Sequence, residues 1–168
     1  MRWAIDSLVA LMIAGVIAGI VLHMRSNEQL EEHRETVRGD VARFRAQVMI
    51  QAAIGQCELS DQGFPATIDP AWFKGDEGGL PQNPLFDDRH PWLEVAGPAQ
   101  SDLVHPSNRV VGEGKAAKFW YNPYTGVVRA RVPARISDEE SLTLYNFVNG
   151  TSLDGLFASG SKFDQPAP

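Results

Sequence analysis

The side chains best suited to chemistry lie close together in the segment 87–90, which reads Asp-Asp-Arg-His. Carboxylates and imidazole are common metal ligands, and Asp76 and Glu77 in the preceding Gly-rich loop offer further oxygens. These acidic residues do not follow the Asp-x-Asp-x-Asp order of a calcium-binding loop. We therefore expect a solvated acidic loop and no metal site, and Asp87 and Asp88 are the candidate ligands if a cation such as calcium binds.

Nucleophilic and cofactor-binding motifs give no better candidate. The four histidines are not spaced as a metal motif, and the single cysteine, Cys57, cannot form a disulfide within the chain. The sequence has no Gly-x-Ser-x-Gly motif, no phosphate-binding loop and no Cys–His motif. It accordingly predicts no enzymatic activity, no cofactor and no small-molecule substrate.

The charge is distributed unevenly along the chain. The formal net charge is −6, and residues 56–168 carry all of it, because the basic and acidic side chains of residues 1–55 balance. A nucleic-acid partner requires a basic face, so an acidic C-terminal part excludes that class of partner. Hydrophobic residues make up 43% of the chain, which is enough to build a core.

A long apolar run near the N-terminus is predicted to form a helix. Residues 8–22 contain no charged side chain, and with the flanking apolar residues the run reaches roughly the 30 Å of a bilayer's hydrocarbon layer. A cleaved signal peptide is the alternative, but no small-x-small cleavage site follows the run. We expect a retained transmembrane helix over residues 1–25, with the acidic Asp6 near its start.

The same helix is predicted to continue as an amphipathic helix over residues 26–55. Apolar side chains recur there at helical spacing, with Arg and Glu on the other faces, and Gly55 is the first stop signal. The apolar positions are Leu30, Val37, Val41, Phe44, Val48 and Ala52.

This N-terminal half resembles the first helix of type IV pilins and of the pseudopilins of type II secretion. If Arg2 is set at the mature start, Asp6 falls on the family's acidic position, and Gly15 and Gly19 fall on its small-residue positions. Met1 stands where the family's leader ends in Gly, and Arg2 replaces the usual aromatic residue. Three explanations stay open: a start further upstream, an edited mature form, or a protein that the prepilin peptidase does not process.

The resemblance implies an assembly role for three residues. In the family, the carboxylate at the position of Asp6 pairs with the N-terminal amine of a neighbouring subunit. The alternative is that Asp6 only lies at the membrane interface, near the positive end of the helix dipole. Gly15 and Gly19 have the Gly-x-x-x-Gly spacing that permits close approach of helices.

Residues 56–158 are expected to form a small head, followed by a flexible tail at residues 159–168. The best strand signal is residues 117–133, where an aromatic run, an Asn-Pro-Tyr-Thr-Gly turn and an alternating run predict a hairpin. Val128, Ala130 and Val132 should face the core, and Arg129 and Arg131 should face outward. Ser137 and Glu140 fit a helix capping box, although a strand stays open there.

The expected fold is thus α+β, with a long transmembrane and then amphipathic helix packed on a small antiparallel sheet. The expected function is that of a structural subunit of a pilin-like filament or pseudopilus, in secretion or in adhesion and motility. Its partners would be membrane lipid and other pilin-like subunits. The alternative is a single-pass anchored binding module. In both cases the protein would lie in the inner membrane with its head in the periplasm.

Overall fold

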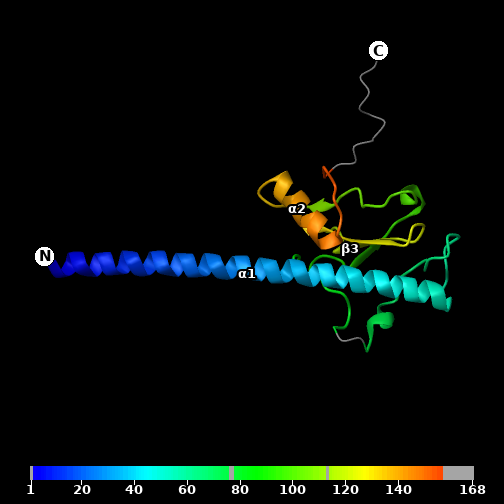
Figure 1. Ribbon diagram of the computed structural model, residues 1–168, viewed down its shortest axis with the longest axis horizontal. Coiled ribbons are helices and arrows are strands. Elements are labelled where there is room, and N and C mark those ends of the chain that lie inside the picture. The colour runs from blue at the N-terminus through cyan, green and yellow to red at the C-terminus, as the bar shows by residue number, and fades with distance from the viewer. Residues whose placement is uncertain (1, 76–77, 113, 157–168) are drawn as a thin grey trace, which may run out of the picture. The chain divides into compact units, whose positions relative to one another are not determined.

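The computed structural model describes residues 2–75, 78–112 and 114–156, and it describes their side chains except at 2–10, 23, 26 and 27. The chain divides into two compact units, Met1–His33 and Arg34–Pro168. The long N-terminal helix α1, Arg2–Ile54, supplies the first unit and one wall of the second (Figure 1). Gly55 follows this helix with a φ of 66°, a left-handed conformation that favours glycine, and its N–H bonds to the Gln51 carbonyl at 3.0 Å.

The expected membrane span is not found. Among the described residues, no helix combines the length and apolar character that crossing a bilayer requires. The predictions of a transmembrane helix at residues 1–25 and of a single-pass inner-membrane protein are therefore wrong.

The sheet of the second unit is mixed, so the prediction of an antiparallel sheet is also wrong. Strand β3 (Phe119–Asn122) pairs antiparallel with β4 (Val127–Ala130) and parallel with β1 (Leu93–Val95). The long connection from β1 to β3 lets the chain return and enter the sheet in the same direction. A second, parallel pair joins β2 (Val110–Val111) to β5 (Val132–Pro133).

The core of this unit forms where one face of α1 meets the sheet. Val37, Val41, Phe44 and Val48, at helical spacing, are at most 1% exposed. Phe44 stacks on Trp92 and meets Phe73 edge-on, with ring centroids 5.4 Å apart in both pairs. Phe73 belongs to the short 3₁₀ helix η1, Pro70–Phe73; a second one, η2, is Pro98–Gln100. These three aromatic side chains pack α1 against loops that are distant in the sequence.

The hairpin predicted at residues 117–133 is present as β3 and β4, and Val128, Ala130 and Val132 are buried as predicted. Arg131 contradicts the prediction, because its side chain is also buried. It lies just after β4, where its guanidinium donates to Glu94 Oε2 at 2.8 Å and to the carbonyls of Asn108 and Ala117. The prediction from the alternating pattern is wrong at Arg131 because loops from distant parts of the chain cover the outer face of the strand.

The last helix, α2 (Asp138–Asn149), settles the choice between helix and strand at this segment. Ser137 is its N-cap and accepts a hydrogen bond from the Glu140 N–H, and Gly150 ends it in a left-handed conformation. Figure 1 shows α2 beside the strands, where it contacts β4 and β5. Its buried Asn149 receives the Ala130 N–H on Oδ1 and donates to the Ala130 carbonyl, both at 2.8 Å.

Candidate functional site

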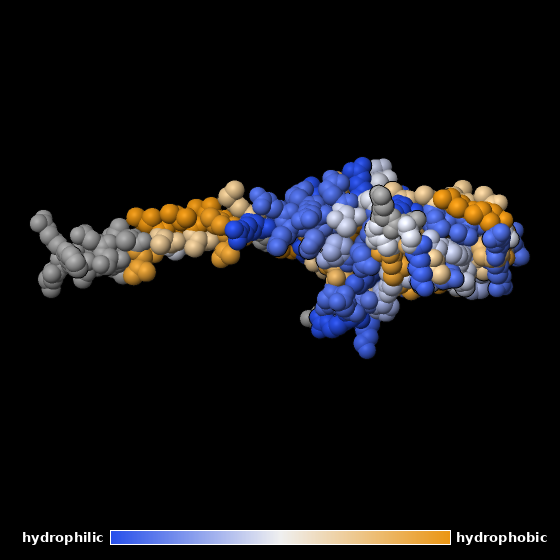
Figure 2. Space-filling model, turned by 90° about the horizontal axis from the view of Figure 1, so that it is seen from below, coloured by the Kyte–Doolittle hydropathy of each residue, from blue (hydrophilic) through white to orange (hydrophobic). Residues whose placement is uncertain are grey.

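The first candidate surface is the apolar segment, which we define as residues 11–22 of α1. Its large side chains are between 44% and 71% exposed, and they point in all directions around the helix. Figure 2 shows this part of the helix as a continuous hydrophobic surface. These exposed residues are Leu11, Met12, Ile13, Val16, Ile17, Ile20, Val21 and Leu22. A helix that is apolar all round is normally covered on every side.

The predicted assembly residues lie in or near this segment. A methyl group added at Gly15 or Gly19 would meet no atom within 4 Å, so nothing within the described chain requires glycine at either position. Their small size is therefore available to a partner that packs closely against α1. Asp6 belongs to α1, but its side chain lies outside the described residues, so its predicted ion pair stays a prediction.

A second apolar surface runs along the outer face of α1 in the second unit. We call it the outer stripe: it lies opposite the buried face, and its members follow the spacing of one helix face. Met49, Ile50 and Ile54 are each about half exposed. The full set is Ala42, Ala46, Met49, Ile50, Ala53 and Ile54. This part of α1 thus has apolar side chains on two faces, although a helix packed on one side of a domain needs only one.

The acidic loop does not form a metal site. Arg89 donates to Asp87 at 2.8 Å from Nε, and this hydrogen bond holds the pKa of the Asp87 carboxyl below its usual range. Asp88 is 3.6 Å from the ammonium of Lys118. Among the described residues, no three potential ligands of a metal ion come together. Asp76 and Glu77 lie outside these residues, so their contribution is not described.

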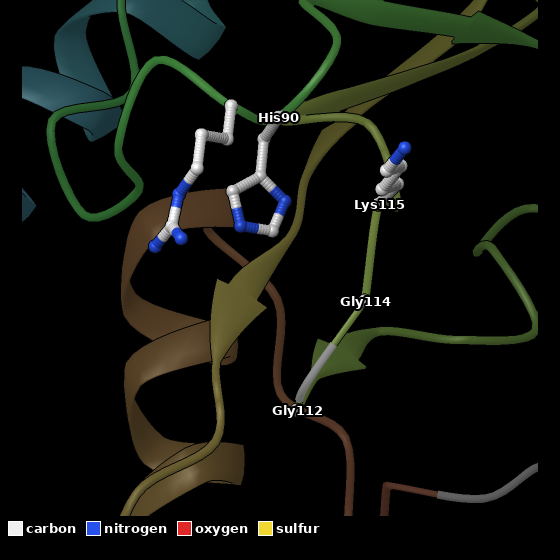
Figure 3. Close-up of a pocket in the computed structure, with 5 residues that line it drawn as sticks. His90, Gly112, Gly114 and Lys115 are labelled. Carbon is white, nitrogen blue, oxygen red and sulfur yellow. The ribbon is translucent and has the colours of Figure 1, made fainter.

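Next to this loop is a cavity of about 520 Å³ lined by Arg89, His90, Gly112, Gly114 and Lys115. Figure 3 shows the His90 ring facing the segment that carries Lys115. The Nδ1 of His90 donates to the Ala116 carbonyl at 2.9 Å, so the ring is held by the loop. Asp87 pairs with Arg89, so Lys115 is the other positive charge that lines the cavity.

A polar cluster that the sequence did not predict lies where α1, β4 and α2 meet. Arg45 and Arg129 both donate to the Val128 carbonyl at 3.2 Å, and Arg45 also donates to the Asn149 carbonyl at 2.9 Å. Arg129 donates from Nε to His105 Nδ1 at 3.3 Å, and the Tyr145 hydroxyl lies 3.0 Å from the same nitrogen. Its members come from distant parts of the chain, and no motif in the sequence links them.

Comparison with known proteins adds no relative. The chain matches no protein-family model, no curated protein and no solved structure. The resemblance to pilins therefore stays a prediction from the residues of the N-terminal half, and any assignment of function has to rest on the surfaces described above.

Proposed function

We propose that this chain is a structural subunit that assembles with other pilin-like subunits, its own copies among them, into a filament or pseudopilus through α1. The observation that carries the proposal is the exposed apolar segment. Contiguous apolar surface of this kind marks an interaction site, because leaving it in water is unfavourable by about 25 cal/mol per Å². The acidic loop does not suggest a competing role, since Asp87 pairs with Arg89 and Asp88 lies near Lys118.

The distribution of apolar side chains favours several neighbours over one. A single partner covers one face of a helix, whereas the apolar segment is exposed on all faces. Each copy therefore needs more than one neighbour around this segment. When a repeated contact uses different surfaces on the two copies and does not close into a ring, the product is an open filament.

The outer stripe supplies a second surface for contacts between copies of the chain. It is another exposed apolar face on the same helix, separated from the apolar segment by the charged residues 25–40. In a stack of copies shifted along the helix direction, the outer stripe of one copy can cover part of the apolar segment of the next. The acidic head, which carries the net charge of −6, keeps such an assembly soluble on its outside.

The test is a pair of glycine substitutions in the full chain. Gly15→Leu with Gly19→Leu should reduce crosslinked multimers severalfold, because two bulky side chains prevent close approach of helices. Gly39→Leu is the matched control: Gly39 is also exposed on α1, with open space around it, but it lies outside both apolar surfaces. Crosslinked multimers that are equally abundant in the double variant and the control would contradict the proposal.

A second variant separates a subunit from a protein that uses α1 only as a tether. Residues 8–22 are replaced by a Leu-rich helix of the same length, which keeps the apolar character but removes the specific packing surface. If the chain is a structural subunit, this replacement should abolish its crosslinked multimers and its function. If α1 is only a tether, the protein should keep its function.

A further inference from the structure

The second unit contains a pair of arginines whose positive charges meet without a carboxylate. Arg45 of α1 and Arg129 of β4 each place a nitrogen 3.2 Å from the same oxygen, that of Val128. The two guanidinium groups are therefore close neighbours. Other arginines of this unit have acidic partners: Arg43 pairs with Asp40 and Arg131 with Glu94, each at 2.8 Å.

Within the part of the chain that the structure describes, neither member of the arginine pair has an ion pair. Both guanidiniums are partly buried, and burial lowers the pKa of each; the neighbouring Arg129 lowers the pKa of Arg45 further. Two like charges in a partly dry environment repel each other more strongly than in water. The carbonyls of Val128 and Asn149 offset this repulsion in part, and Asn149 is the last residue of α2, so Arg45 also lies at the negative end of that helix dipole.

The pair also keeps hydrogen-bond donors free. Arg45 uses Nε and Nη2 for its hydrogen bonds, and Arg129 uses Nε and Nη1. Of the described residues, none accepts a hydrogen bond from Arg45 Nη1 or Arg129 Nη2, and neither nitrogen is among the buried unpaired atoms. Both nitrogens therefore have donors that no described residue uses and that can donate to a ligand.

His105 lies directly beside the pair. Its Nδ1 accepts a hydrogen bond from Arg129, so the neutral ring carries its proton on Nε2. Burial, together with the charges of Arg129, Arg109 and Arg45, lowers the pKa of His105 to about 4. At neutral pH the two arginines are therefore charged beside an uncharged imidazole.

We propose that the arginine pair, with His105 beside it, is a binding site for an oxyanion, that is, a phosphate or carboxylate group. Guanidinium groups present N–H donors in a planar fork that matches these anions, and the anion supplies a negative charge that no described carboxylate gives to this pair. This inference does not rest on assembly through α1, because neither arginine belongs to the apolar segment or to the outer stripe.

The experiment is calorimetric titration of the full chain with inorganic phosphate, with acetate, and with chloride at equal ionic strength. Saturable binding of phosphate alone, or of phosphate and acetate, supports the site and identifies the anion class. Arg129→Gln and Arg45→Gln should each weaken binding by about tenfold or more, because each removes charge-assisted hydrogen bonds. Arg135→Gln, an exposed arginine in the loop before α2, is the matched control and should bind as the wild type does.

A second readout covers the case in which one glutamine variant does not fold. The pKa of His105, followed by the NMR signals of its ring, should rise by about one unit in saturating phosphate, since a nearby anion favours the imidazolium. The proposal is overturned if phosphate and acetate give no saturable heat beyond that of chloride. It is overturned equally if the Arg45 and Arg129 variants that fold bind phosphate as tightly as Arg135→Gln.

Discussion

Arg131 shows how far a single residue can depart from its local pattern. It follows β4, the strand in which apolar and polar residues alternate, yet its side chain has no exposed surface. Glu94 is only partly buried, and the carbonyls of Asn108 and Ala117 accept the remaining donors. A buried guanidinium is tolerated here because each of these hydrogen bonds reduces its desolvation penalty.

His105 allows a prediction about pH at the scale of the residue. Its pKa is about 4 in the folded protein, below the ordinary 6.5, so between these values the unfolded chain binds a proton that the folded chain does not. The free energy of unfolding therefore falls as pH drops from above 6.5 to 4. Tyr145, which also contacts the ring, does not titrate in this range, since burial raises its pKa to about 12.

The variant His105→Gln tests this prediction, because glutamine can still accept from Arg129 but does not titrate. Between neutral pH and pH 4 the wild type should lose about 1–2 kcal/mol more stability than the variant. This is less than the full linkage value, since solvent screens a partly buried imidazole. Urea unfolding over a pH series measures it, and parallel stability curves for the two proteins would contradict it.

At the scale of the element, α2 depends on its N-cap. Ser137 Oγ accepts the Glu140 N–H at 3.1 Å, and Asp138, Glu139 and Glu140 place three negative charges in the first turn. These features oppose the positive end of the helix dipole and satisfy one otherwise unpaired donor. The cap can therefore be read from the sequence, whereas the choice between helix and strand for this segment was made by the structure.

Removing the cap should destabilise the second unit. Ser137→Ala is expected to lower the free energy of unfolding by about 1 kcal/mol, whereas Ser137→Asp, which restores a cap oxygen, should stay near the wild type. Ser107→Ala, at an exposed serine outside the helices, controls for loss of a hydroxyl elsewhere. If Ser137→Ala and Ser107→Ala change the urea midpoint equally, the cap contributes nothing.

At the scale of the whole molecule, an assembly of copies needs an interaction that fixes how far neighbouring α1 helices are shifted along each other. The resemblance to pilins implies that Asp6 pairs with the N-terminal amine of a neighbouring copy. We expect Asp6→Ala to reduce crosslinked multimers severalfold and Asp6→Glu to retain most of them, because the longer side chain still carries the charge. Mass analysis of crosslinked products from the full chain measures this, and unchanged multimers in Asp6→Ala would count against the ion pair.

Local signals in the sequence located the elements that depend on their own residues. The hairpin at residues 117–133 was readable because its turn residues and alternating strand act within a few positions. Its inward side chains Val128 and Ala130 followed from the period of a strand, and the cap of α2 was visible in Ser137 and Glu140.

The sequence by itself determined the extent of the N-terminal helix, its apolar run at residues 8–22, the inward face of residues 26–55 and the acidity of the head, because these follow from neighbouring residues and simple sums of charge. Only the tertiary structure decided that β1 joins the sheet in parallel, that Arg131 is buried, and that Arg45, His105 and Arg129 meet. The physical reason is that each of these depends on contacts between distant segments. Such contacts are selected by packing and desolvation over the whole core, and no local pattern encodes them.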